Sequence, residues 1–332
     1  MIKTGLFLLV STAAFFLCFR AGYISLLTWE WLSVMKPQAE AWESSLINYQ
    51  NMFAGLLTAI AVFAAKGRKA PPLNIFVILF FIFSIFIVLS QIFSLNSTLS
   101  AFKFNLAAEM LFLTFAILLM SNTKLKIQAL LWVFVISVGY YGVTRGLMSI
   151  ASGGRSSIRG AANSILQDNN QLAMALASMA PLALYLFRTS ADAKWFSRMQ
   201  TIENASQDNS FMTRVKAWDV AYHMGLKYPV LGAGGTIQYY PLYNSAFIAE
   251  EVVEKRRNGL LATHNAYLEI LAGNGFIAFG AFLGMIGTAI MWCSKINKVT
   301  QNIPGLLWAA ELGTMLQISL VVYAIGSMAL ST

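Results

Sequence analysis

Residues 73–93 read LNIFVILFFIFSIFIVLSQIF and contain no charged side chain. As an α-helix, these 21 residues are long enough to cross the hydrocarbon core of a bilayer, which is about 30 Å thick. Lipid offers no hydrogen-bond partner to a bare backbone, so a segment of this composition inside a membrane has to be helical. The stretch therefore predicts a membrane-spanning helix.

The rest of the 332-residue chain has the same character. Hydrophobic residues make up 58% of it and charged residues 11%, whereas soluble domains carry about 25% charged residues. The sequence predicts an all-α, polytopic transmembrane helical bundle of about eight spans, at residues 4–19, 50–65, 73–93, 104–120, 128–149, 168–188, 275–293 and 305–328. The first stretch could be a signal peptide, but it has no clear cleavage site, so we interpret it as a retained span.

The net charge of +9 comes from basic residues that gather in short loops beside the expected spans. Cytoplasmic loops of membrane proteins carry such an excess, so we expect no nucleic-acid partner. The strongest basic loops are expected to be cytoplasmic and lie near residues 66–69, 124–126, 188–198 and 295–298. This orientation places residues 20–49, 94–103 and 150–167 outside. The aromatic segment Ala21–Met35 is expected to be interfacial or re-entrant.

The expected spans and loops divide the chain into three regions. Residues 1–188 form an N-terminal transmembrane bundle, residues 189–274 a large extracytoplasmic hydrophilic loop, and residues 275–332 the C-terminal transmembrane helices. The crossing count is inconsistent, because residues 189 and 295 are both expected to be cytoplasmic and only one convincing span, 275–293, lies between them. The stretch 211–233 cannot supply a crossing, since each charge at mid-membrane costs about 3 kcal/mol.

A histidine stands where the hydrophilic loop meets the next helix, in Thr263-His264-Asn265-Ala266-Tyr267-Leu268-Glu269. The chain has two histidines, His223 and His264. A neutral histidine can take a proton from a hydroxyl nucleophile. The alternative is an interfacial histidine with a structural hydrogen bond. Asn265 is a plausible N-cap for the helix.

The hydrophilic loop also contains an amphipathic helix candidate at Phe211–Lys227. Arg214 and Trp218 are four residues apart and therefore share one face of it. A turn-rich stretch, Tyr228–Gly235, follows, and its glycines would let backbone N–H groups approach an anion. A plain surface turn is the alternative interpretation.

Arginines gather on the outer side between two spans, where the positive-inside rule leaves few of them. Arg145, Arg155 and Arg159 lie within fifteen residues. Guanidinium groups bind phosphate in a bidentate manner, so we expect a phosphate site there. The alternative is a loop that reaches lipid headgroups. Asp168 is expected to cap the next helix. Cys18 and Cys293 are far apart in sequence, form no metal-binding spacing and are interpreted as packing residues.

These motifs, in this order, resemble the O-antigen ligase and polymerase superfamily. The resemblance rests on Arg214 with Trp218, the glycine turn, and His264-Asn265-x-Tyr267-Leu268-Glu269. The chain also resembles the exosortase A-associated O-glycosylation ligases. That likeness is carried by Phe19-Arg20-Ala21-Gly22-Tyr23, Trp29-Glu30-Trp31, Met35-Lys36-Pro37, Gly153-Gly154, Asp168-Asn169-Asn170-Gln171-Leu172-Ala173, Trp195-Phe196-x-Arg198-Met199-x-Thr201-Ile202 and Trp308-Ala309-Ala310.

The resemblance implies a GT-C-like fold and a metal-independent, inverting glycan transfer without a cofactor. The donor would be a glycan on undecaprenyl pyrophosphate, and the acceptor a hydroxyl of a protein or surface glycan at the periplasmic face of the inner membrane. The resemblance makes His264 the base and Arg214 a phosphate ligand, with Arg155 or Arg159 as second arginine. Further substrate-binding residues would be Arg145, Asn169, Asn170, Trp218, Gly234, Asn265, Tyr267 and Glu269.

The chain departs from the family pattern in two places, and other functions stay open. Between Lys194 and Trp195 we expect three spans to be missing, and the C-terminus at Ser331-Thr332 is expected to be shortened. The chain would then be a shortened, inactive homologue or an incomplete gene model. A polysaccharide polymerase would use the same donor. A non-catalytic transporter or scaffold is the rival from another class; Glu109 and Glu311 lie within spans, but no internal repeat supports it.

Overall fold

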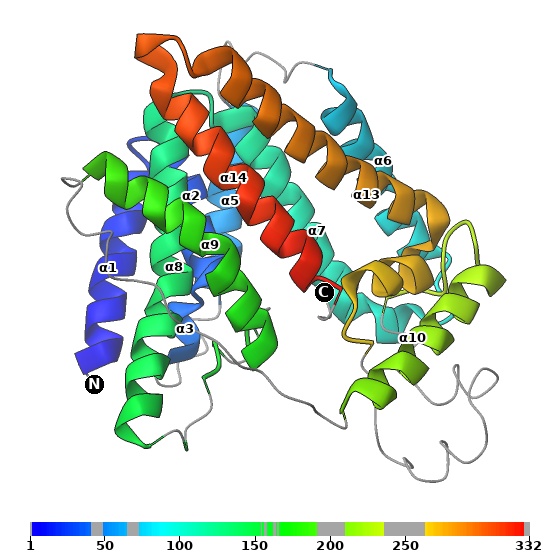
Figure 1. Ribbon diagram of the computed structural model, residues 1–332. Coiled ribbons are helices and arrows are strands. Elements are labelled where there is room, and N and C mark those ends of the chain that lie inside the picture. The colour runs from blue at the N-terminus through cyan, green and yellow to red at the C-terminus, as the bar shows by residue number, and fades with distance from the viewer. Residues whose placement is uncertain are drawn as a thin grey trace. The chain divides into compact units, whose positions relative to one another are not determined.

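The computed structural model describes residues 2–40, 49–64, 73–153, 155, 158–161, 164, 166–190, 210–235 and 263–328. All regular secondary structure within these ranges is helical (Figure 1). The all-α, polytopic membrane class expected from the sequence is therefore confirmed.

All eight expected spans are helices in the described part of the chain. Six of them are long and apolar enough to cross a membrane. These are α6 (Ile75–Ile92), α7 (Ser97–Met120), α8 (Lys124–Ala151), α9 (Asn169–Ser190), α13 (Ala266–Thr300) and α14 (Leu307–Gly326). The other two, α1 (Ile2–Cys18) and α5 (Gln50–Ala64), have 17 and 15 residues. Whether α1 and α5 cross the membrane stays a prediction.

The described residues form two compact units. Unit 1 comprises Met1–Pro72 and Met110–Thr189, and unit 2 comprises Leu73–Glu109 and Ser190–Thr332. These two units group residues by packing. The three regions expected from the sequence group residues by membrane topology, so the division into three regions stays a prediction.

The segment expected to be interfacial or re-entrant, residues 21–35, contains helix α2 (Gly22–Val34), and its position in the membrane stays a prediction. Leu26, Trp29 and Leu32 are buried inside unit 1, where α2 packs against α1, α5 and α8. The ring of Trp29 lies 5.5 Å from that of Phe112, and Gly55 leaves room for its indole. The sequence did not predict this packing, because composition does not distinguish a ring that packs on protein from one at the headgroup level. The short α3 (Pro37–Glu40) follows.

The arginine-bearing loop of unit 1 is anchored by apolar residues. Ala161 and Leu166 are buried in a cluster with Tyr141 and Leu172. The Gly160 amide donates to the Leu166 carbonyl at 2.9 Å. This anchoring closes the loop beside the start of α9.

In unit 2, α13 lies beside α6 and α14, and α10 (Ser210–Lys227) packs against its N-terminal part (Figure 1). Helix α13 is interrupted at Gly275, whose φ of 81° is not helical. The expected span began at residue 275 because the apolar run starts there. The helical turns before the kink, residues 266–274, carry the motif after His264.

The kink at Gly275 should make this glycine hard to replace. The Gly275→Ala variant would bring Cβ into the Val230 carbonyl and hold an alanine at positive φ. We expect a loss of about 2 kcal/mol or more in unfolding free energy. The midpoint of thermal unfolding in detergent, followed by tryptophan fluorescence, measures it.

Gly280→Ala is the matched control, because Gly280 lies on the same helix with no atom near its added Cβ. We expect this variant to unfold within about 0.5 kcal/mol of the parent protein. Equal unfolding midpoints for the two variants would contradict the account of the kink.

Candidate functional site

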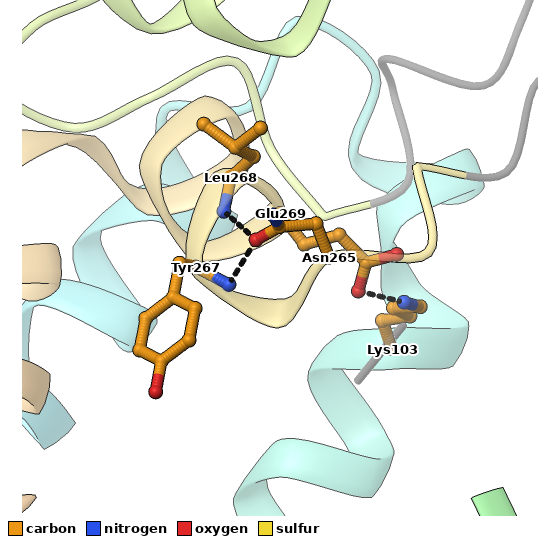
Figure 2. A network of polar contacts seen from close by, with 5 residues as sticks. All are labelled: Lys103, Asn265, Tyr267, Leu268 and Glu269. Atoms are coloured by element: carbon orange, nitrogen blue, oxygen red, sulfur yellow. Dashed lines mark hydrogen bonds and ion pairs between the residues drawn. The ribbon is translucent and has the colours of Figure 1, made fainter. Parts of the chain in front are cut away.

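The candidate site lies at the N-terminus of α13, directly after His264. The Asn265 side-chain oxygen accepts the amides of Tyr267 and Leu268, both at 3.1 Å (Figure 2). The Asn265 carbonyl accepts the Glu269 amide at 3.0 Å. The expected N-cap is confirmed, and it fixes the residue next to the candidate base.

The C-terminal end of α14 completes this cap. The Ala266 amide donates to the Ser327 carbonyl at 2.9 Å, and the Tyr267 hydroxyl donates to the Ala324 carbonyl at 2.8 Å. With these contacts, all four first amides of α13 bond to protein atoms. A free helix N-terminus attracts anions, but this one is already satisfied. Tyr267, expected to bind substrate, makes a contact that holds α13 to α14.

Trp218 holds the chain on the other side of His264. Its indole N–H donates to the Thr263 carbonyl at 2.7 Å, and Thr263 is 1% exposed. His264 itself has a φ of 45°. That left-handed conformation is uncommon outside glycine, although histidine tolerates it better than most residues. Anchors at Thr263 and Asn265 can impose such strain, which proteins concentrate at functional sites.

Helix α10 confirms the amphipathic helix expected at residues 211–227. Its buried face, Ala217, Val220, Ala221 and Met224, follows helical spacing. Gly225 lets the helix approach Leu271 of α13 closely. Arg214 lies one turn before Trp218 on α10, and its side chain is outside the described residues.

Lys103 is a site residue that the sequence did not predict. Its ammonium lies 3.0 Å from a carboxylate oxygen of Glu269 (Figure 2). The sequence placed residues 94–103 in a loop, but α7 begins at Ser97, where the Asn96 side chain accepts the Leu99 amide at 3.1 Å. That cap was the available signal, because it extends the helix back past Lys103.

The glycine turn at residues 228–235 has a structural role that neither interpretation anticipated. Gly232, Ala233 and Gly234 are buried. The amides of Ala233 and Gly234 donate to the carbonyls of Ala272 and Gly273 at 2.8 and 3.0 Å. An alanine at 232 would overlap the backbone at Gly273 and Asn274. These two amides bond to α13, so they are not available to an anion, and the turn is exposed only in its first part, at Pro229 and Val230.

The remaining expected site residues belong to unit 1. Arg145 is half-buried near the end of α8, and Arg155 and Arg159 are exposed in the loop after it. Asn169 and Asn170 form the first turn of α9, where the Asp168 carboxylate accepts the amides of Asn170 and Gln171 at 2.9 and 3.3 Å. The predicted Asp168 cap is confirmed.

Two sets of candidate residues result. Unit 2 brings together Trp218, Gly234, His264, Asn265, Tyr267 and Glu269, and adds Lys103. Unit 1 holds the three arginines and the two asparagines. Each set lies within one unit.

The Trp218 hydrogen bond can be tested without an activity assay. In Trp218→Phe the buried Thr263 carbonyl loses its donor, at a cost of about 1–3 kcal/mol. We expect amide hydrogen exchange in residues 263–268 to become about tenfold faster or more. Trp292→Phe is the control, because Trp292 is 43% exposed on α13. Unchanged exchange in Trp218→Phe would show that the indole does not hold this segment.

Two protein-family models match the sequence. A model described as O-antigen ligase matches residues 106–283, and a family of unknown function matches residues 2–191. No curated protein and no solved structure matches the chain. The first match covers more than half of the chain and includes all the site residues expected from the sequence, from Arg145 to Glu269. The chain belongs to the O-antigen ligase family.

Proposed function

We propose that this protein is a glycan ligase of the inner membrane. It transfers a glycan from undecaprenyl pyrophosphate to a hydroxyl of a protein or surface glycan at the periplasmic face. The observation that carries the proposal is His264, held in a left-handed conformation between two anchored residues in a member of the O-antigen ligase family. The resemblance to exosortase A-associated ligases supports a protein O-glycosylation role.

His264 acts as the general base in this reaction. Its neutral imidazole takes the proton of the acceptor hydroxyl as that oxygen attacks the anomeric carbon. The bond between the anomeric carbon and the pyrophosphate oxygen breaks, and the undecaprenyl pyrophosphate leaves with the electron pair. Attack opposite to the leaving group inverts the anomeric centre. No metal takes part in the step as proposed.

Arginines stabilise the leaving group. Negative charge grows on the pyrophosphate as the bond breaks, and a bidentate guanidinium is suited to meet it. Arg214 is one helical turn before Trp218, which itself bonds to the residue preceding His264. The family resemblance also assigns a second guanidinium to Arg155 or Arg159, and substrate binding to Arg145, Asn169 and Asn170.

The other histidine, His223, lies on the surface of a helix. His223 is exposed on α10. Its Nδ1 lies 3.3 Å from an Asp219 carboxylate oxygen and 2.9 Å from the Asp219 carbonyl. These are contacts within one helix turn, typical of a solvated helix surface.

The two histidines make a matched pair for testing the base. His264→Ala should lower glycan transfer by about 100-fold or more, while membrane insertion and thermal unfolding stay normal. His223→Ala should retain nearly full transfer. Glycan attachment to the acceptor, normalised to folded protein, is the measurement.

A bacterial strain that carries His264→Ala distinguishes a ligase from a polymerase. A ligase defect leaves finished chains on the polyprenyl carrier, whereas a polymerase defect leaves single repeat units there. Normal glycan attachment by His264→Ala would rule out its role as the base.

The two asparagine caps provide a second test. Asn265→Ala and Asn74→Ala each remove an N-cap, since the Asn74 side chain accepts the Val77 amide at 3.0 Å at the start of α6. Each should cost about 1 kcal/mol of stability. Only Asn265→Ala should reduce transfer per folded protein, because it adjoins His264. Equal losses of transfer would mean that the cap acts through stability alone.

A further inference from the structure

Glu269 is an ionisable side chain buried beside the candidate base. Its side chain is 4% exposed, whereas that of Lys103 is 27% exposed, and their charged atoms are 3.0 Å apart. A buried carboxylate is strongly disfavoured unless a cation and hydrogen bonds compensate it. Lys103 supplies that compensation from α7, a different helix.

The carboxylate belongs to the same helical turn as the cap. The Glu269 amide bonds to the Asn265 carbonyl, so Glu269 follows His264 by little more than one turn of chain. Glu269 therefore lies in the first turn of α13, directly after the proposed base.

Other charged groups on the neighbouring elements are few among the described residues. Helix α10 has Asp219 and His223, which pair with each other, and Lys227, which lies over the Tyr228 ring. It also has Arg214 and Lys216, whose side chains are outside the described residues. Helix α14 has Glu311, at the end opposite to Ala324 and Ser327, which contact the start of α13. Helix α6 has no charged residue. Among these groups, Lys103 is a cation in direct contact with the Glu269 carboxylate.

The fold makes room for Lys103 at this position. A Cβ added to Gly235 would lie 3.3 Å from the Lys103 Cβ, tighter than an ordinary contact. The glycine turn that docks on α13 thereby also lets α7 bring its lysine to Glu269. Three segments of unit 2 meet at the ion pair.

We propose that Lys103 is a positioning residue, which neutralises Glu269 and thereby keeps the His264 site receptive to an anionic donor. The proposal rests on the proposed function, since it concerns a pyrophosphate donor and a neutral imidazole. An uncompensated carboxylate here would repel the donor and stabilise the imidazolium form of His264. The pair also ties α7 to α13 within unit 2.

The test uses four variants of the full-length protein in detergent or liposomes. They are Lys103→Met, Lys103→Arg, Glu269→Gln and the double variant Lys103→Met with Glu269→Gln. Folded protein is measured by thermal unfolding, and transfer is measured as kcat and KM for the lipid-linked donor and as the pH dependence of kcat/KM. Lys227→Met is the control for loss of a lysine.

Lys103→Met removes the ammonium that lies 3.0 Å from the Glu269 carboxylate. The KM for the donor should rise by roughly tenfold, the scale of one lost charge interaction. A nearby negative charge raises the pKa of a histidine, so the limb on which the rate increases with pH should move up by about one pH unit. Glu269→Gln leaves the lysine instead, which lowers the pKa of the histidine and moves that limb down.

The double variant distinguishes compensation from direct binding. If Lys103 acts through Glu269, removing both charges restores the pH profile and most of the KM, and Lys103→Arg and Lys227→Met resemble the parent protein. A purely structural role would change the amount of folded protein without moving the pH profile, and that result would overturn the proposal.

Two other results would overturn it as well. A double variant that keeps the high KM of Lys103→Met would make Lys103 a direct ligand of the donor. Shifts of the pH profile in the same direction for Lys103→Met and Glu269→Gln would exclude charge compensation. Failure of the proposed function itself is recognised separately, by full transfer in His264→Ala.

Discussion

The hydrogen bond from the Trp218 indole to the Thr263 carbonyl is the contact on which the arrangement around His264 depends. It ties α10 to the residue before His264, while the Asn265 cap fixes the residue after it. Between these anchors the chain turns through a left-handed conformation that a free histidine would rarely adopt. The surrounding structure imposes the strain, and the imidazole is presented from a fixed point of the backbone.

The glycines of unit 2 make these contacts possible. Gly225 brings α10 onto Leu271, and Gly232 brings the following turn onto the backbone at Gly273. The Gly273 carbonyl accepts both the Gly234 amide and the Ser90 hydroxyl of α6. Helices α6, α10 and α13 are thereby held together where the apolar span ends at Gly275. The helical turns of α13 before that glycine contain the polar residues of the candidate site.

Much of this fold could be predicted from local sequence, and the misses share one cause. Long apolar runs fix the spanning helices because lipid leaves no other structure for them, and side chains such as Asn265 and Asp168 cap helices through their own neighbours. The burial of α2, the amides of Gly234 and the pairing of Lys103 with Glu269 depend on residues distant in sequence. Sequence patterns report periodicity and local chemistry, so contacts between separate helices escape them.

The central requirement is that the arginine loop and His264 face the same side of the membrane. In the described chain one candidate span, α9, lies between them, and one crossing alone would put them on opposite faces. The proposed function therefore requires a further crossing. In a variant with both native cysteines replaced, single cysteines at Ile158, which is 38% exposed, and Leu260, outside the described residues, test this requirement. The account predicts that a membrane-impermeant maleimide added from the periplasmic side labels both. Labelling of Leu260→Cys only after the cytoplasmic face is opened would contradict it.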